Sequence, residues 1–219
     1  MQEVTLVPEQ FDDKEQQHLA ATLGMWIFLT TEVLFFGGLI ASYTVYRYLY
    51  LPAFEIGSRD LSVMWGAINT AVLICSSLTM AMAVRAAQLG RRKQVITFII
   101  PTMILGLAFL FIKFDMEWYR TEYLHGLMPG VNFTYVGLHA HHVELFMFFY
   151  YVLTGLHGFH MIVGVGVLTA MLIMAIRHRF DDGRSNPIEI AGLYWHFVDI
   201  VWIFLFPLLY LIGGRYHVP

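Results

Sequence analysis

The sequence predicts an all-α polytopic membrane protein, a bundle of five transmembrane helices with its amino terminus inside the cell. Of its 219 residues, 58% are hydrophobic and 13% are charged, whereas soluble domains carry about 25% charged residues. The mean hydropathy is +0.63. The charges collect between apolar runs, and each run has roughly the 20 residues that a helix needs to cross a ~30 Å hydrocarbon core. This pattern excludes a soluble globular enzyme.

Five apolar segments account for the predicted spans, in the order 19–50, 61–88, 95–114, 143–176 and 191–212. Polar stretches such as 51–60 and 177–190 separate them. The first and fourth segments are longer than a bilayer requires, so we expect them to tilt or to project beyond it.

The polar ends of the chain complete the predicted organisation. We expect a polar amino-terminal segment at 1–17, a transmembrane bundle at 18–214 and a short outer tail at 215–219. The amino-terminal segment is acidic and lacks a basic region followed by a short apolar core, so it does not resemble a signal peptide.

The basic residues predict the orientation, because Lys and Arg near helix ends are retained on the cytoplasmic side. Eight of the 13 fall on one side of the predicted membrane: Lys14, Arg85, Arg91, Arg92, Lys93, Arg177, Arg179 and Arg184. Five fall on the other: Arg47, Arg59, Lys113, Arg120 and Arg215. We expect Arg47 and Lys113, which lie at helix ends, to snorkel toward water. The amino terminus is therefore expected inside and the carboxyl terminus outside.

Charge and cysteine content limit the possible chemistry. The net charge of −3 offers no basic surface, so nucleic-acid binding is not indicated. The single cysteine, Cys75, allows no intramolecular disulfide and no thiolate cluster. Any redox centre in this chain would have to rest on histidine.

Glu32 is an ionisable residue within the first predicted span. It lies 13 residues beyond Leu19, which places it about 20 Å along a helix and near the middle of the membrane. Desolvation should leave such a carboxyl largely protonated. It could be hydrogen-bonded to a neighbouring helix, exchange protons, or face a lipid or a partner subunit.

Histidines form a second polar group in the last two predicted spans. His157 and His160 are three residues apart, as are His196 and Asp199, so each pair lies on one helical face. With the predicted orientation, all four fall in the inner half of the membrane. We expect a hydrogen-bonded packing cluster that joins the last two helices, and a haem or metal site is the alternative.

The segment before the fourth span contains His139, His141, His142 and Glu144. Short histidine-rich tracts can bind metal. The favoured interpretation is an interfacial loop with hydrated imidazoles, and we expect no metal site.

Two further patterns concern packing and membrane ends. Gly155, Gly158, Gly164 and Gly166 are expected to form a helix-packing face. The charged and aromatic stretch 115–120 is expected to anchor the third helix at the membrane interface.

Four motifs resemble subunit III of the haem-copper terminal oxidases, the cytochrome c oxidase and quinol oxidase family. They occur in the family's order and the resemblance covers about residues 18–214. The motifs are TEVLFFG at 31–37, INTAVL at 68–73, GLHGFHMIVG at 155–164 and YWHFVDIVW at 194–202.

The resemblance implies a non-catalytic core subunit of an oxygen-reducing, proton-translocating complex. Subunits I and II of such complexes hold haem and copper, so no catalytic residue, metal or other redox cofactor is expected here. Subunit III packs on subunit I near a proton-uptake path, binds phospholipid and protects the working enzyme from inactivation. The electron donor, cytochrome c or quinol, would be bound by other subunits, and the expected location is a bacterial-type plasma membrane.

The resemblance also implies roles for individual residues. Glu32 matches the membrane carboxyl that reacts with carbodiimide in this family. Asn69, Glu189, Trp195 and Trp202 stand at family-motif positions.

The chain departs from the family pattern in two respects. Many members have seven helices, divided two and five by a lipid-filled cleft, and this chain begins at what would be the third. The cleft is therefore expected to be absent or completed by another chain. Residues 138–151 match no family pattern.

The leading hypothesis is a cytochrome c oxidase subunit III that supports proton uptake and turnover stability. A quinol oxidase subunit or a nitric oxide reductase accessory subunit is the nearer alternative. The distant alternatives are a b-type membrane cytochrome and a small proton-coupled transporter that uses Glu32. Transport is disfavoured because no inverted repeat or broken helix pair is evident.

Overall fold

The computed structural model describes residues 14–137, 139–178 and 185–212. The predicted outer tail lies outside the described residues, as does most of the predicted polar segment at 1–17. The same holds for three members of the basic-residue count, Arg179, Arg184 and Arg215.

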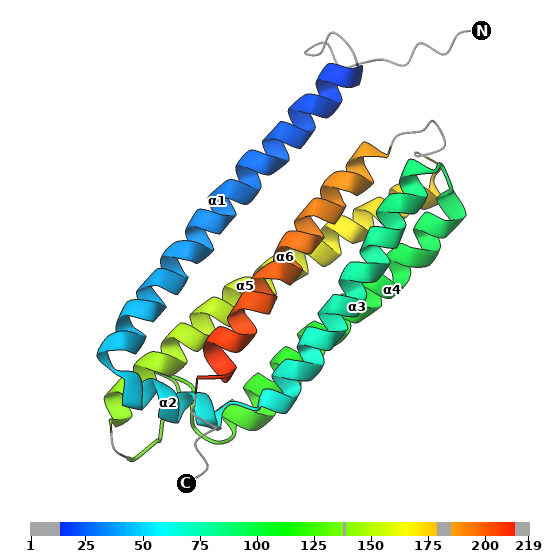
Figure 1. Ribbon diagram of the computed structural model, residues 1–219. Helices are drawn as coiled ribbons and strands as arrows, with labels where there is room; N and C mark the ends of the chain where they lie inside the picture. The colour runs from blue at the N-terminus through cyan, green and yellow to red at the C-terminus, as the bar shows by residue number, and fades with distance from the viewer. Residues whose placement is uncertain (1–13, 138, 179–184, 213–219) are drawn as a thin grey trace, which may run out of the picture.

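Five long helices form an elongated bundle, as predicted (Figure 1). They are α1 (Lys14–Leu49), α3 (Val63–Gln88), α4 (Arg92–Phe111), α5 (Ala140–Ile176) and α6 (Asn186–Tyr210). α4 continues without a break into a π-helical stretch, η1 (Ile112–Tyr123). Each of the five is long and apolar enough to cross a membrane.

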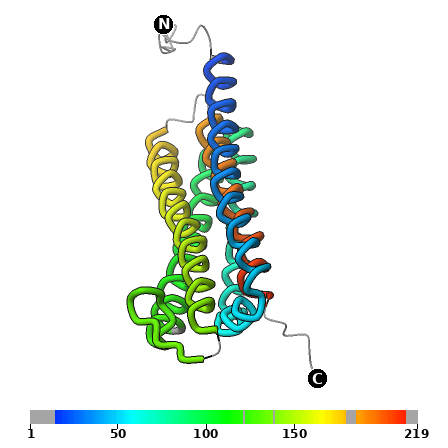
Figure 2. The backbone as a smooth tube through the Cα atoms, turned by 90° about the vertical axis from the view of Figure 1, so that its left-hand side faces the viewer, coloured from blue at the N-terminus to red at the C-terminus, as the bar shows by residue number. Residues whose placement is uncertain are grey.

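The long helices alternate in direction along the chain, so the described chain begins and ends at opposite ends of the bundle (Figures 1 and 2). We call these the Lys14 end and the Ile212 end. The α3–α4 turn and the start of α6 lie at the Lys14 end, whereas η1 and the start of α5 lie at the Ile212 end.

A sixth helix, α2 (Leu51–Asp60), lies across the Ile212 end where the sequence predicted a polar connection (Figure 1). Its buried residues are Ala53, Phe54, Gly57 and Ser58. Their spacing of one, three and four positions puts them on one helical face, and this face packs on α5. The connection is therefore a capping helix, because it carries an apolar stripe among its polar residues.

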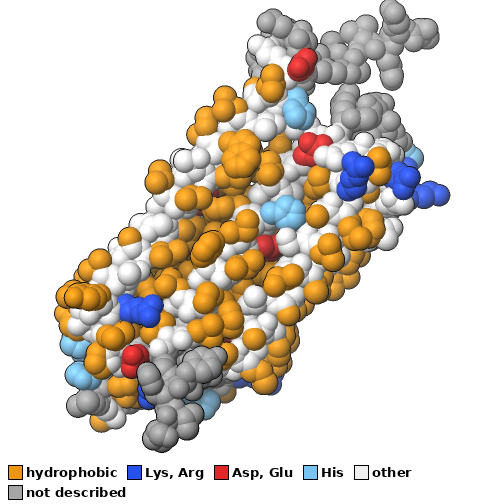
Figure 3. Space-filling model, viewed as in Figure 1, with side chains coloured by type: hydrophobic (Ala, Val, Ile, Leu, Met, Phe, Trp, Pro, Cys, Tyr) orange, Lys and Arg blue, Asp and Glu red, His pale blue; other side chains and the backbone are white. Residues whose placement is uncertain are grey.

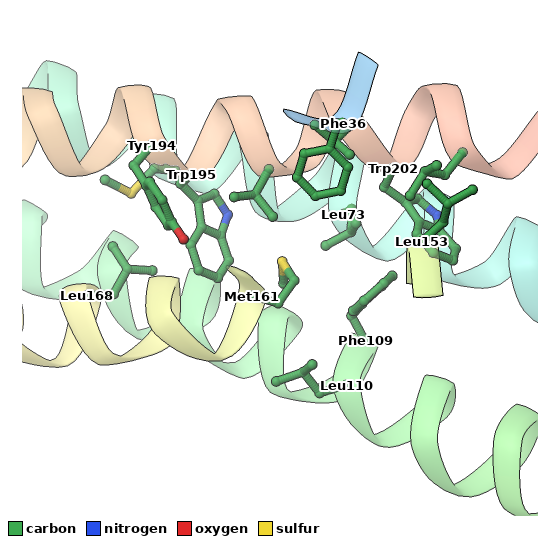
Figure 4. Close-up of a cluster of buried hydrophobic side chains, with 14 of the residues drawn as sticks. Phe36, Leu73, Phe109, Leu110, Leu153, Met161, Leu168, Tyr194, Trp195 and Trp202 are labelled. Carbon is green, nitrogen blue, oxygen red and sulfur yellow. The ribbon is translucent and has the colours of Figure 1, made fainter. Parts of the chain in front are cut away.

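Helix α6 is the most enclosed of the spans. In an 18-residue apolar stretch of α6, 50% of the residues are buried, whereas 11% are buried in the corresponding stretch of α1. Trp195 and Trp202 point from α6 into the core (Figure 4). A buried indole N–H requires an acceptor, and each finds one on α3: the Trp195 indole donates to Ser76 Oγ (2.9 Å) and the Trp202 indole to Thr70 Oγ1 (3.1 Å).

Three of the four glycines that the sequence predicted to form a packing face on α5 do so, and the prediction is wrong for Gly166. A β-carbon at Gly155, Gly158 or Gly164 would lie 3.3, 3.1 or 3.0 Å from ring atoms of Trp118, Phe114 or Trp195. A side chain at Gly158 or Gly164 would therefore force its aromatic neighbour to move. Gly166 is different, since no atom lies within 4 Å of such a β-carbon.

Helix α1 is attached along a single stripe. Leu29, Phe36 and Tyr43 are buried and lie seven residues apart, which keeps them on one face of the helix. The Tyr43 hydroxyl donates to the carbonyl oxygen of Leu208 on α6 (3.0 Å). Much of the rest of α1 exposes large apolar side chains, and hydrophobic side chains are spread over the face shown in Figure 3.

Candidate functional site

A carboxyl and an imidazole meet between α1 and α5. Glu32 Oε2 lies 3.1 Å from Nε2 of His160. The two side chains are only 18% and 12% exposed, and the Phe36 ring packs 5.3 Å from the imidazole. The pair therefore faces the bundle and is shielded on one side by an aromatic ring.

The other ring nitrogen of His160 determines how protons are distributed in this pair. Nδ1 lies 2.8 Å from the carbonyl oxygen of Leu156. A carbonyl oxygen can only accept, so Nδ1 carries a hydrogen. One further proton must then lie between Nε2 and the carboxyl, giving either neutral acid and imidazole or carboxylate and imidazolium. In both states the pair is neutral overall and holds one transferable proton.

Glu32 lies halfway along α1, 18 residues from Lys14 and 17 from Leu49. At 1.5 Å per residue it is about 25 Å from either end of the helix. A charged group at such depth is costly unless it is paired. The neighbouring imidazole provides the hydrogen-bond partner that the depth of Glu32 requires.

The predicted cluster of His157, His160, His196 and Asp199 is distributed over separate contacts. His160 bonds Glu32, whereas His196 Nδ1 lies 2.7 Å from the hydroxyl of Ser77 on α3. Among the described residues, no hydrogen bond joins two of the four. This differs from the single hydrogen-bonded cluster expected from the sequence, because His160 turns toward α1 and His196 toward α3.

His157 lies in an aromatic environment inside the bundle. It is 1% exposed, and neither ring nitrogen has a hydrogen-bond partner among the described residues. Its ring lies 5.3 Å from that of Phe109 and 5.2 Å from that of Trp202. These contacts join α5 to α4 and α6, so His157 does tie the last two helices, through ring packing.

A buried ion-pair network near the Ile212 end was not predicted from the sequence. It consists of Lys113, Glu117, Glu122, Tyr150 and Tyr210, each at most 1% exposed. The Lys113 ammonium donates to Glu117 and to the hydroxyls of Tyr150 (2.7 Å) and Tyr210 (2.6 Å). Tyr150 in turn donates to Glu122 Oε1 (2.6 Å), and Tyr210 donates to Glu117 Oε2 (2.7 Å). The network connects η1 to α5 and α6.

The prediction that Lys113 snorkels to water is therefore wrong. The stretch 115–120 is the predicted interface anchor, but Glu117 within it is buried. Lys113, Glu117 and Glu122 are spaced by four and five residues, which suits a helix with i→i+5 hydrogen bonds. A periodicity of 3.6 would have put Glu122 on the opposite face from Lys113. Asp115 and Arg120, joined at 3.0 Å, and the exposed ring of Tyr119 behave as the predicted anchor.

Glu122 is a carboxyl of this network whose pKa is shifted by burial. It follows the membrane-length part of the helix, which ends at Arg120. Burial raises the pKa of Glu122 to about 7, and the nearby Lys113 ammonium partly opposes this rise. Its second oxygen, Oε2, has no hydrogen-bond partner among the described residues. Glu122 can therefore gain or lose a proton near neutral pH.

Most of the family-motif residues are buried in the interior of the bundle. Trp195 and Trp202 belong to the core. Asn69 is fully buried, and neither atom of its amide group has a hydrogen-bond partner in the described parts of the chain. Glu189, in the first turn of α6, lies 3.9 Å from His18 Nε2 of α1.

The histidine-rich segment lines a pocket of about 670 Å³ at the Ile212 end. His142 stacks on the Tyr50 ring with centroids 3.9 Å apart, and His141 Nδ1 lies 3.9 Å from Glu144 Oε2. His139 precedes α5 with a left-handed backbone (φ 61°). Within the described ranges, no three His, Cys, Asp or Glu side chains are grouped so that they could hold a metal ion.

Known proteins resemble this chain over most of its length. The family model for cytochrome c oxidase subunit III matches residues 12–214. Quinol oxidase subunit 3 of Bacillus subtilis is 31% identical over 191 residues, which cover 87% of this chain and 86% of the relative. A probable quinol oxidase subunit 3 of Staphylococcus aureus is 30% identical over 194 residues, covering 89% and 90%. That of Staphylococcus saprophyticus is 28% identical over 202 residues, covering 92% and 94%.

The relatives are bacterial proteins, and the described part of the chain has five helices of membrane length. It is an integral protein of the plasma membrane. The match over nearly the whole chain confirms the resemblance found in the sequence. The chain belongs to the cytochrome c oxidase subunit III family and is subunit III of a haem-copper oxidase complex.

Proposed function

We propose that this chain is the non-catalytic subunit III of a proton-pumping aerobic oxidase that takes electrons from a quinol. The relatives from Bacillus and Staphylococcus carry the name quinol oxidase subunit 3 and match this chain over most of its length. This favours quinol over cytochrome c, the donor that the sequence alone had put first. Haem and copper belong, in this proposal, to subunits I and II.

The contact between Glu32 and His160 is the observation that supports a role in proton supply. The pair holds one transferable proton inside the membrane without a net charge. When uptake of a proton from one side is coupled to release of the shared proton to the other, the pair returns to its neutral state, so no net charge remains in a medium of low dielectric constant. We assign it to proton supply for subunit I, and Glu32 to the carboxyl that reacts with carbodiimide.

The exposed surface of α1 supports a role in assembly. Leu23, Ile27 and Leu34 are 62%, 58% and 71% exposed, and in a membrane such side chains contact lipid tails or other transmembrane helices. We assign the exposed α1 face to phospholipid and to neighbouring oxidase subunits. The chain would thus stabilise the complex around the proton path.

Purification of the intact complex through a tag on this chain tests the proposal. After extraction in a mild detergent, the partners are identified by mass spectrometry, the haem spectrum is recorded, and oxygen consumption is measured with a quinol and with reduced cytochrome c. We expect haem-bearing partners and oxygen reduction driven by the quinol. Recovery of the chain without haem-bearing partners would contradict its place in an oxidase, and activity with cytochrome c alone would contradict the donor.

The variant Glu32→Gln separates a supporting role from a catalytic one. Gln keeps the shape and a hydrogen-bonding end but holds no exchangeable acid proton. We expect a fully assembled complex that still reduces oxygen. Complete loss of oxygen reduction in an assembled variant would show that Glu32 has a catalytic role.

A further inference from the structure

A groove between α3 and α6 contains polar side chains that do not contact the Glu32–His160 pair. It has a volume of about 380 Å³, and three of its lining side chains, Ser77, His196 and Asp199, are polar. In Figure 3, pale blue and red side chains appear among the orange and white ones over these helices. Two apolar residues on its rim, Leu78 and Ile200, are 61% and 50% exposed. The groove therefore opens sideways toward the lipid.

Asp199 is the unsatisfied group of this groove. The residue is 2% exposed, and neither carboxyl oxygen has a hydrogen-bond partner among the described residues. Ser77 also lines the groove, but its hydroxyl lies 2.7 Å from Nδ1 of His196 and makes no hydrogen bond to Asp199. A buried carboxyl without a partner is costly. The groove thus lacks at least one hydrogen-bond donor.

The depth of Asp199 limits what can provide that donor. Asp199 is 13 residues from Asn186 and 11 from Tyr210, which places it about 20 Å and about 17 Å from the ends of α6. Water and phospholipid headgroups lie outside the hydrocarbon core, which is ~30 Å thick. The donor must therefore be a lipid-soluble molecule with a polar group, or a side chain from another transmembrane helix.

We propose that this groove binds the ring of a membrane quinol, with one ring hydroxyl donating to Asp199 and the other ring oxygen reaching His196. This proposal rests on the proposed quinol-oxidising function, and it differs from the expectation that other subunits alone bind the quinol. A quinol has the two features that the site demands: it dissolves in the hydrocarbon core, and its hydroxyls complement the carboxyl oxygens. The apolar walls accept the ring and its tail, since ligand sites combine an apolar lining with a few placed polar groups.

The binding test uses the intact complex in nanodiscs free of quinone and a photoreactive azido-benzoquinol with a decyl tail. After illumination, the labelled peptides of this chain are identified by mass spectrometry. We expect labelling within 73–81 and 196–203, suppressed by excess unmodified decyl benzoquinol. Asp199→Leu removes the acceptor, so we expect groove labelling to fall about tenfold, whereas Asp199→Asn, which keeps an acceptor oxygen, should retain more of it.

A matched pair of variants controls for general effects on α3. Ala81 lines the groove, whereas Ala71 is also exposed on α3 but does not line it. Ala81→Phe should block labelling and Ala71→Phe should not. Absence of groove labelling in a complex that oxidises the quinol overturns the site and leaves the proposed function standing.

Two other outcomes are equally decisive. Groove labelling in a complex that does not oxidise the quinol overturns the proposed function but keeps the binding site. If Ala81→Phe releases a partner subunit and Ala71→Phe does not, the occupant is a neighbouring helix and the quinol site is wrong.

Discussion

Glu32 of α1 and His160 of α5 lie 3.1 Å apart between two helices, and the tautomer of His160 is determined by its bond to the carbonyl oxygen of Leu156. The histidine thus presents to the carboxyl a nitrogen whose protonation state is linked to that of Glu32. One proton serves both groups. Substitutions of Glu32 can therefore distinguish the effect of this shared proton from the effect of helix packing.

Substitution of Glu32 tests the neutral form of the pair. In that form His160 Nε2 is an acceptor, so Glu32→Gln can donate from its amide and preserve the contact. Glu32→Leu leaves the nitrogen unpaired at a cost of about 1–3 kcal/mol. We expect the melting temperature of the purified complex to stay near wild type in the Gln variant and to fall in the Leu variant. Equal destabilisation by both changes would indicate the ionised form, and Val33→Leu, on the exposed face of α1, controls for substitution in the helix.

The Lys113 network should matter greatly for stability. Lys113→Met leaves the Glu117 carboxyl buried without its counter-charge, and breaking a buried pair in this way costs about 3–5 kcal/mol. The double variant Lys113→Met with Glu117→Gln removes both charges and should recover part of the loss. Thermal unfolding of the complex in detergent measures both effects.

Arg120 provides the control for that prediction, because its pair with Asp115 is 61% exposed on the arginine side. An exposed ion pair contributes at most about 1 kcal/mol, so Arg120→Met should change the melting temperature little. If Lys113→Met and Arg120→Met behave alike, the ammonium of Lys113 is hydrated and the buried network is wrong.

Glu122 should make stability depend on pH in a defined direction. Its pKa is raised from an ordinary value of 4.5 to about 7 in the folded chain, mainly by burial. Between these values the folded protein keeps a proton that the unfolded chain releases, so stability is greatest below 4.5 and is lost as the pH rises through 7. Glu122→Gln keeps an oxygen that accepts the hydrogen bond from Tyr150, but its side chain has no carboxyl group to titrate.

Melting temperatures of wild type and Glu122→Gln should therefore diverge in favour of the variant as the pH is raised. The difference should level off above the folded pKa. Glu189→Gln, at the partly exposed start of α6, serves as the reference substitution. A difference that does not vary with pH would show that Glu122 does not titrate in this range.

The predicted orientation can be tested by cysteine labelling in intact cells. Arg91 lies in the α3–α4 turn and Leu124 follows η1 at the opposite end, and both are exposed. In a chain with Cys75→Ala, an impermeant thiol reagent should reach Leu124→Cys and should not reach Arg91→Cys, because the excess of basic residues predicts that the α3–α4 turn is cytoplasmic. The reverse labelling pattern would invert the topology.

The five spans were predictable because apolar length is a property of local sequence. The 20-residue requirement of the bilayer and the separating charges locate each helix without any knowledge of its neighbours. The packing role of Gly155, Gly158 and Gly164 was predictable for a similar reason, since small residues at helical spacing mark a close approach. Helix α2 was missed because its composition is polar and its apolar stripe is short.

The polar contacts were less predictable because they depend on helix rotation and on departures from α-helical periodicity. His157 and His160 are neighbours on α5, yet one faces Trp202 and the other faces Glu32. Lys113 and Glu122 join one network only because η1 has π-helical hydrogen bonding. The four-and-five spacing of Lys113, Glu117 and Glu122 was the available signal, and a periodicity of 3.6 conceals it.

The number of turnovers that the assembled oxidase completes before it inactivates, measured against pH with a quinol donor, tests the central claim most directly. If Glu32 and His160 support proton supply, Glu32→Gln should match wild type in initial rate at acidic pH. It should inactivate after progressively fewer turnovers as the pH rises and protons become scarce. Equal turnover numbers for the variant and wild type at every pH would contradict the claim that this pair supports proton uptake.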